Sequence, residues 1–121
     1  MKHAIHHPKV FIPNKGFHDY QRAERFGELV YITEGSLNRF EINQIARQCA
    51  DALRDATAGD YLLISSLPAI SAIASAMFAV RFGRLNLLLH DGRTGEYVSR
   101  SVVIPKEDES GEPIYASGQS A

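Results

Sequence analysis

The chain has 121 residues, the length of a single domain built around one hydrophobic core. Its hydrophobic fraction of 45% and charged fraction of 22% are typical of a globular protein, and its formal net charge of −1 argues against a strongly basic nucleic-acid-binding protein. The charge is unevenly placed, because the segment after Ile104 carries −3 and the rest of the chain therefore carries +2. That mild positive excess is compatible with an anionic ligand.

The chain has one cysteine, Cys49, which excludes an intrachain disulfide and favours a reducing, cytoplasmic setting. Residues 1–8 contain three histidines but no apolar stretch of the kind found in secretory signals. We interpret them as a flexible N-terminus rather than a metal site, and we expect no metal site elsewhere. The longest apolar stretch, residues 69–80, is too short to span a membrane.

The first third of the chain predicts strand, short helix and strand. Residues 9–12 form an apolar strand that should end at the Pro-Asn-Lys-Gly sequence of residues 13–16. Asp19 can cap a short helix over residues 20–26, and Gly27 can close it.

Residues 28–33 predict a second strand, and their consecutive apolar side chains are typical of a strand buried on both faces. A turn at residues 34–36 follows. Asn38, with Glu41 three residues later, resembles a capping box, so we expect a helix from there to about Ala56. Its apolar side chains fall on one face: Ile42, Ile45, Ala46, Cys49, Leu53 and Ala56.

The next unit reads strand–helix–strand. An apolar run after Asp60 ends at Ser65-Ser66, and a helix over residues 68–82 begins with Pro68 and ends before Gly83. This helix has almost no polar face, so it must be covered on more than one side. A domain this small has little chain left to cover it, and we therefore predict a homodimer that forms through the helix over residues 68–82.

The last elements form a hairpin. Residues 85–89 predict an apolar strand, residues 90–95 a turn with Asp-Gly, and residues 96–104 an antiparallel edge strand that Pro105 stops. The remaining segment, residues 105–121, is acidic and polar, and we expect it to be disordered.

The predicted order of elements is β–short α–β–α–β–α–β–β. Strands that alternate with helices indicate an α/β domain over residues 9–104, with a mostly parallel sheet and an antiparallel C-terminal edge hairpin. We therefore predict a small Rossmann-like fold.

In such a sheet a ligand binds in the crevice at the carboxyl ends of the strands. The turns predicted there are small and polar, and the helix that Pro68 begins would offer free N–H groups to an anion. The alternative for Ser66 is a simple helix cap. No Walker or dinucleotide motif is present, and the cofactor is therefore left unassigned. The predicted ligand-binding residues are Lys15, Glu34, Gly35, Ser65 and Ser66.

From these features we predict a binding module for a small anionic ligand, with a nucleotide as one candidate, that acts as a sensor or sequestering protein. Two rival classes stay open. One is a weak hydrolase or nuclease that uses Ser66 with His18 or His90 and Asp91, although no nucleophile elbow supports it. The other is a non-catalytic adaptor. The arginines are scattered, so nucleic acid is not the favoured partner.

Overall fold

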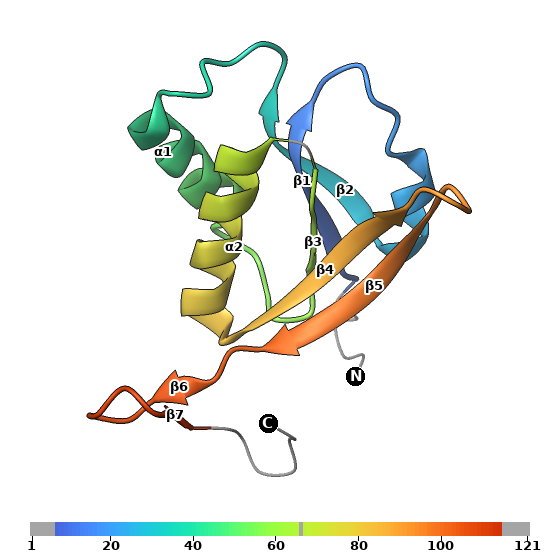
Figure 1. Ribbon diagram of the computed structural model, residues 1–121. Coiled ribbons are helices and arrows are strands. Elements are labelled where there is room, and N and C mark those ends of the chain that lie inside the picture. The colour runs from blue at the N-terminus through green and yellow to red at the C-terminus, as the bar shows by residue number, and fades with distance from the viewer. Residues whose placement is uncertain (1–6, 66, 115–121) are drawn as a thin grey trace, which may run out of the picture.

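The computed structural model describes residues 7–65 and 67–114. The described chain forms a five-stranded sheet in the order β2-β1-β3-β4-β5 (Figure 1). The three pairs that β1, β2, β3 and β4 form are parallel, and β4 pairs antiparallel with β5. The prediction of a mixed α/β chain with a mostly parallel sheet and an antiparallel C-terminal hairpin is therefore confirmed. The strand bounds are β1 Lys9–Lys15, β2 Glu28–Glu34, β3 Tyr61–Leu63, β4 Arg84–Asp91 and β5 Glu96–Val103.

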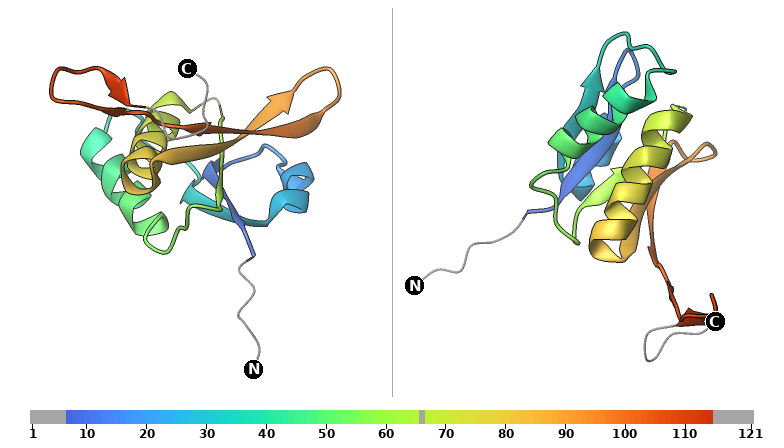
Figure 2. Two further views of the ribbon diagram at one scale, coloured as in Figure 1. Left: turned by 90° about the horizontal axis from the view of Figure 1, so that it is seen from below. Right: turned by 90° about the vertical axis from the view of Figure 1, so that its left-hand side faces the viewer.

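The helices are divided between the two faces of the sheet (Figures 1 and 2). Helices α1 (Ile42–Ala52) and α2 (Pro68–Phe82) cover one face, and η1 (Gln21–Phe26) lies on the other. The sequence predicted a short α-helix over residues 20–26, and this prediction is wrong, because the segment forms the 3-10 helix η1. The Ala23 N–H donates to the carbonyl of Tyr20 at 2.8 Å, the i to i+3 spacing that short segments favour.

Two hydrophobic clusters hold these layers together. Under α1 and α2, Phe11 of β1 meets Phe78 of α2 edge to face, with ring centroids 6.4 Å apart. On the opposite face, Val10 and Ile12 of β1 pack with Ala23 of η1. Strand β1 is thus buried on both faces, as expected for the centre of a parallel sheet.

Both N-terminal strands differ from the prediction. Strand β1 continues through Pro13, which has no counterpart in the register with β2 and lies beyond the two β1 residues that pair with β3. The missing N–H of Pro13 therefore leaves no gap in the sheet. Strand β2 was predicted to be buried on both faces, but it is an edge strand and Leu29, Val30 and Tyr31 are only half-buried.

Helix α1 is shorter than predicted at both ends. The predicted capping box is wrong, because the Asn38 Oδ1 accepts from the Phe40 N–H at 3.0 Å in a turn and no side chain caps the helix. At the other end, the Arg81 guanidinium of α2 donates to the carbonyls of Leu53 and Arg54. These carbonyls would otherwise accept hydrogen bonds from further turns of α1. A cation from the neighbouring helix bonds to them instead.

Helix α2 has the predicted bounds, and Gly83 closes it in the left-handed conformation at φ 69°. Its inner side packs on the sheet and on α1, whereas Ala72, Ala76 and Val80 are not buried by either. In the part of the chain that the structure describes, no helix has both the length and the apolar character needed to cross a membrane.

Residues 106–114 form a short antiparallel hairpin, which the sequence did not predict. Strands β6 (Lys106–Glu107) and β7 (Pro113–Ile114) pair with each other, and all their residues are exposed. Hydrogen bonds from Ser110 and Glu112 to the Asp108 carboxylate close the turn and lower the pKa of Asp108. The predictions for residues 1–6 and 115–121 fall outside the described residues.

Among the described glycines, Gly27 has the least room for a side chain, because it lies against Pro8 where the two N-terminal strands start, and this yields a stability prediction. A Cβ at Gly27 would lie 2.2 Å from the Pro8 carbonyl oxygen, and this backbone atom cannot easily move away. We expect Gly27→Ala to lower the free energy of unfolding by about 1–3 kcal/mol, as overpacking does. Urea denaturation measures this. Gly92→Ala is the control, because a Cβ at Gly92 would have no neighbour within 4 Å. Equal losses in both variants would contradict the prediction.

Candidate functional site

Strands β1, β2, β3 and β4 are parallel, so their carboxyl ends lie at the same end of the sheet. The loops that leave this end run in two directions (Figure 1). The loop after β1 leads to η1 on one face, and the loop after β3 leads to α2 on the other. A pocket of about 290 Å³ opens beside this divergence, and we call it the donor pocket. Its lining residues are His18, Tyr20, Leu63, Ile64, Ser65, His90 and Tyr97.

Two histidine–tyrosine contacts form the walls of the donor pocket. His18 and Tyr20 belong to the loop between β1 and η1, and their ring centroids lie 4.7 Å apart. His90, near the end of β4, is paired in register with Tyr97 of β5, and their rings meet edge to face at 5.3 Å. Paired residues of antiparallel strands point to the same face, so both of these side chains face the pocket.

The two tyrosines present protonated hydroxyl groups at neutral pH. Burial raises the pKa of Tyr20, and the neighbouring Tyr31 raises it further. Burial also raises the pKa of Tyr97, with smaller contributions from Tyr20 and Asp19. Both phenols can therefore donate a hydrogen bond to a ligand.

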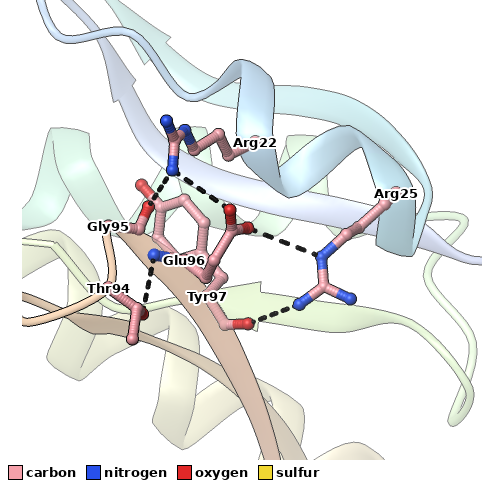
Figure 3. A network of polar contacts seen from close by, with 6 residues as sticks. All are labelled: Arg22, Arg25, Thr94, Gly95, Glu96 and Tyr97. Atoms are coloured by element: carbon pink, nitrogen blue, oxygen red, sulfur yellow. Dashed lines mark hydrogen bonds and ion pairs between the residues drawn. The ribbon is translucent and has the colours of Figure 1, made fainter.

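A polar network fixes the wall that carries Tyr97, as Figure 3 shows. The Arg22 Nη1 of η1 donates to the Glu96 Oε2 at 3.1 Å and to the Gly95 carbonyl at 3.4 Å. The Arg25 Nη2 donates to the Tyr97 carbonyl at 2.9 Å, and its Nε lies 3.9 Å from the Glu96 Oε1. These exposed ion pairs contribute little stability each, but together they hold η1 against the start of β5.

No carboxylate lines the donor pocket among the described residues. Asp91, which follows His90, accepts a hydrogen bond from the Arg93 N–H at 2.9 Å in the hairpin turn. Neighbouring residues of a strand point to opposite faces, so Asp91 is not placed to orient the His90 ring. The Ser65 Oγ is engaged by its own backbone segment, because it accepts from the Leu67 N–H at 3.3 Å.

A comparison with protein families matches residues 8–104 to the family described as Phage Pam3 gp32-like protein. The chain belongs to this family. The match spans all five strands of the main sheet and every residue of the donor pocket, and it ends before the β6–β7 hairpin. No curated protein and no solved structure matches the chain.

The residues that the sequence predicted to bind a ligand fall into two groups in the structure. Lys15 and Glu34 are register partners at the ends of β1 and β2, and the Gly35 N–H donates to the Lys15 carbonyl at 2.9 Å. Glu34 lines a separate pocket of about 210 Å³ beside α1. Ser65 lines the donor pocket, and Ser66 lies outside the described residues. A shared ligand for all five therefore stays a prediction.

Sequence reasoning missed Tyr20 and Tyr97 as pocket residues, although it noted His18 and His90. A signal for Tyr97 was present. A four-residue turn after Asp91 pairs Asp91 with Glu96 and therefore pairs His90 with Tyr97. For Tyr20 the sequence offers no comparable signal, because its position depends on how the loop after β1 folds onto the opposite sheet face.

No group of three or more potential metal-ligating side chains occurs in the described ranges 7–65 and 67–114. The thiol of Cys49 is fully buried under α1, and burial raises its pKa to about 11. The reactive thiolate is therefore scarce at neutral pH, and a nucleophilic role for Cys49 has no structural support.

The buried thiol yields a direct prediction. At pH 8 the native protein should not react with a thiol-specific disulfide reagent over the time in which the denatured protein reacts completely, because Cys49 is both inaccessible and protonated. Ala50→Cys is the matched control, since Ala50 is exposed one residue further along α1. Native Cys49 reacting as fast as the introduced thiol would contradict the prediction.

Proposed function

We propose that this protein is a non-catalytic module that binds a small anionic ligand in the donor pocket, with a nucleotide as one candidate. The observation that carries the proposal is the chemistry of the lining. Five side chains there can donate a hydrogen bond, from His18, Tyr20, Ser65, His90 and Tyr97, and no described lining residue is a carboxylate. Such a lining suits an oxyanion better than a cation.

The topology supports the same position. The direction in which the chain moves across the sheet reverses between β1 and β3. From β1 the chain continues to β2 on one side, and from β3 it continues to β4 on the other side. In open α/β sheets ligands bind outside the carboxyl ends of the strands at such a reversal. The donor pocket takes His18 from the loop after β1 and Ser65 from the segment after β3. We therefore retain a Rossmann-like arrangement as a proposal for the fold family.

Lys15 and the Glu34-Gly35 turn remain proposed contacts for the outer part of a larger ligand. Lys15 is the last residue of β1, and His18 of the donor pocket follows three residues later, so the two lie on one short stretch of chain. A nucleotide has a phosphate and a base several ångströms apart, and it can therefore reach beyond one pocket of this size. Ser66 remains a proposed contact on its position in the sequence alone.

The rival hydrolase hypothesis named Ser66, which lies outside the described residues, but its two histidines, His18 and His90, line the donor pocket together with Ser65. A serine nucleophile needs a hydrogen-bonded base, and that base needs an orienting group. Asp91 bonds to the Arg93 backbone instead, and no described carboxylate lines the pocket. Binding without turnover is therefore the preferred function.

Mass spectrometry of small molecules that copurify with the native protein tests the proposal first. We expect an anionic compound to be retained, and a phosphate-bearing one would agree with a nucleotide. A protein that retains none, and that binds neither ADP nor inorganic phosphate at millimolar concentration by calorimetry, would favour the adaptor class. Turnover of the retained compound that His90→Ala abolishes would favour the hydrolase.

Tyr97→Phe gives the sharper prediction, because it keeps the ring against His90 and removes only the hydroxyl. A hydrogen bond to a charged group contributes about 1.5–3 kcal/mol, so calorimetry should show ADP binding weakened roughly tenfold or more. Tyr31→Phe is the matched control, since Tyr31 lies on the same sheet face but does not line the donor pocket. Equal affinity of wild type and Tyr97→Phe would remove Tyr97 from the site.

We also propose that the protein forms a homodimer through the outer side of α2. Ala72, Ala76 and Val80 follow one another at a spacing of four residues, and Val80 is 88% exposed. The small side chains of Ala72 and Ala76 would allow a second helix to approach closely. A second copy would cover the apolar side of α2 that the sheet and α1 leave open.

A charge on this surface tests the dimer. Val80→Glu would place an unpaired carboxylate in the contact, and light scattering at micromolar concentration should change from dimer to monomer. Asn43→Glu is the control, because it adds the same charge to an exposed position of α1. A wild-type protein that is already monomeric, or a Val80→Glu protein that remains dimeric, would contradict this interface.

A further inference from the structure

A second hollow, of about 360 Å³, lies near the amino ends of β3 and β4, on the sheet face that carries η1. We call it the Arg84 hollow. Contacts between η1 and β5 involve residues 95–97, and the hollow lies further along β5. Its lining residues are Ala58, Gly59, Tyr61, Arg84, Asn86, Ser99 and Ser101.

The strand register explains why these polar side chains gather here. Asn86 of β4 is paired with Ser101 of β5, and Leu88 is paired with Ser99. Side chains of a strand alternate between faces, so Arg84 points to the same side as Asn86. The lining of the hollow thus comes from the two strands of the C-terminal hairpin and from the segment that leads into β3.

All hydrogen-bonding positions of the Asn86 side chain are occupied by other protein groups. Asn86 therefore supports the hollow and is not itself available to a ligand. Its Nδ2 donates to the carbonyls of Ala58 at 2.7 Å and Asp60 at 3.0 Å. Its Oδ1 accepts from the Ser101 hydroxyl at 2.8 Å and from the Arg84 Nη2 at 3.1 Å. Asn86 therefore holds one end of the Arg84 guanidinium in place.

The charge of Arg84 is not balanced in the described part of the chain. Its guanidinium donates to the neutral Asn86 amide, and its Nε is buried with no partner among the described residues. By contrast, Arg22, Arg25, Arg54 and Arg93 each lie within ion-pair distance of a carboxylate. A partly buried guanidinium that lacks a counterion costs solvation free energy, which a bound anion would restore.

We propose that the Arg84 hollow binds an oxyanion, either the phosphate or the carboxylate group of a small molecule. Arg84 supplies the charge, held in orientation by Asn86. The hydroxyls of Tyr61 and Ser99 form no hydrogen bond with another described residue, and they are the additional donors. The hollow shares no lining residue with the donor pocket, so this proposal does not depend on the proposed function.

Nuclear magnetic resonance of the full chain tests the proposal, because an arginine Nε–H gives its own signal. Inorganic phosphate and acetate are titrated separately at constant ionic strength. We expect at least one of them to shift the Arg84 Nε–H signal saturably, and the more effective anion identifies the ligand class. The absence of a saturable shift with either anion at tens of millimolar would overturn the proposal.

Arg84→Gln should weaken binding of that anion by roughly tenfold or more, which is about 1.4 kcal/mol or greater. Arg100→Gln is the matched control, because Arg100 lies on β5, is exposed, donates to the Ser99 carbonyl and does not line the hollow. It should retain affinity within about twofold, since distant exposed charges are screened by salt. Equal weakening by both variants would show a diffuse charge effect and overturn the site.

Arg84→Gln also removes a bond to Asn86, so two milder variants protect the test against misfolding. Ser99→Ala and Tyr61→Phe remove a hydroxyl each and leave the hydrogen bonds of Asn86 intact. Each should weaken the same anion several-fold with an unchanged melting temperature, and unchanged affinity in both would contradict their role as donors. Signals of His90 and Tyr97 report the donor pocket independently, so failure at one site does not imply failure at the other.

Discussion

The position of β3 depends on a buried carboxylate, because this strand has too few residues to fix itself. Strand β3 has three residues, and it pairs with each neighbour at only two positions. Asp60, fully buried just before it, accepts from the Lys9 N–H at 2.9 Å and the Thr57 N–H at 2.8 Å. Asn86 then joins the Asp60 carbonyl to β4. Each buried N–H left unpaired costs about 1–3 kcal/mol, so this connection adds substantially to what the short ladder contributes.

The same connection determines where both proposed sites lie. Fixing β3 against β1 and β4 at their amino ends also fixes the divergence of the loops at their carboxyl ends, where His18 and Ser65 meet in one pocket. Asn86 has two tasks, since its Nδ2 holds the segment before β3 while its Oδ1 holds Arg84. The framework of the fold and the orientation of a candidate ligand group therefore share one side chain.

Local signals allowed some elements to be predicted, and long-range contacts decided the others. Pro68 and Gly83 mark the ends of α2 within the sequence itself, and the structure agrees with both. The end of α1 was not predictable, because Arg81 from another helix satisfies its last carbonyls. The edge position of β2 was not predictable either, since an apolar run does not reveal the order of strands in a sheet.

The candidate sites also depend on long-range contacts. Carboxylates near them are bonded to other groups, so the hydrogen-bond donors of the sites have no described carboxylate beside them. Ser65 was found because the ends of parallel strands are known ligand positions, whereas the tyrosines and Arg84 required the register and the packing. Acids near this sheet face have partners of their own: Asp60 bonds to backbone N–H groups, Asp91 to Arg93 and Glu96 to the arginines of η1. The formal net charge of −1 does not show that the carboxylates and the free donors lie in different places. The donor pocket and the Arg84 hollow are lined by hydrogen-bond donors without a described carboxylate, and this is the basis on which we propose two anion sites on one face of a chain that is slightly acidic as a whole.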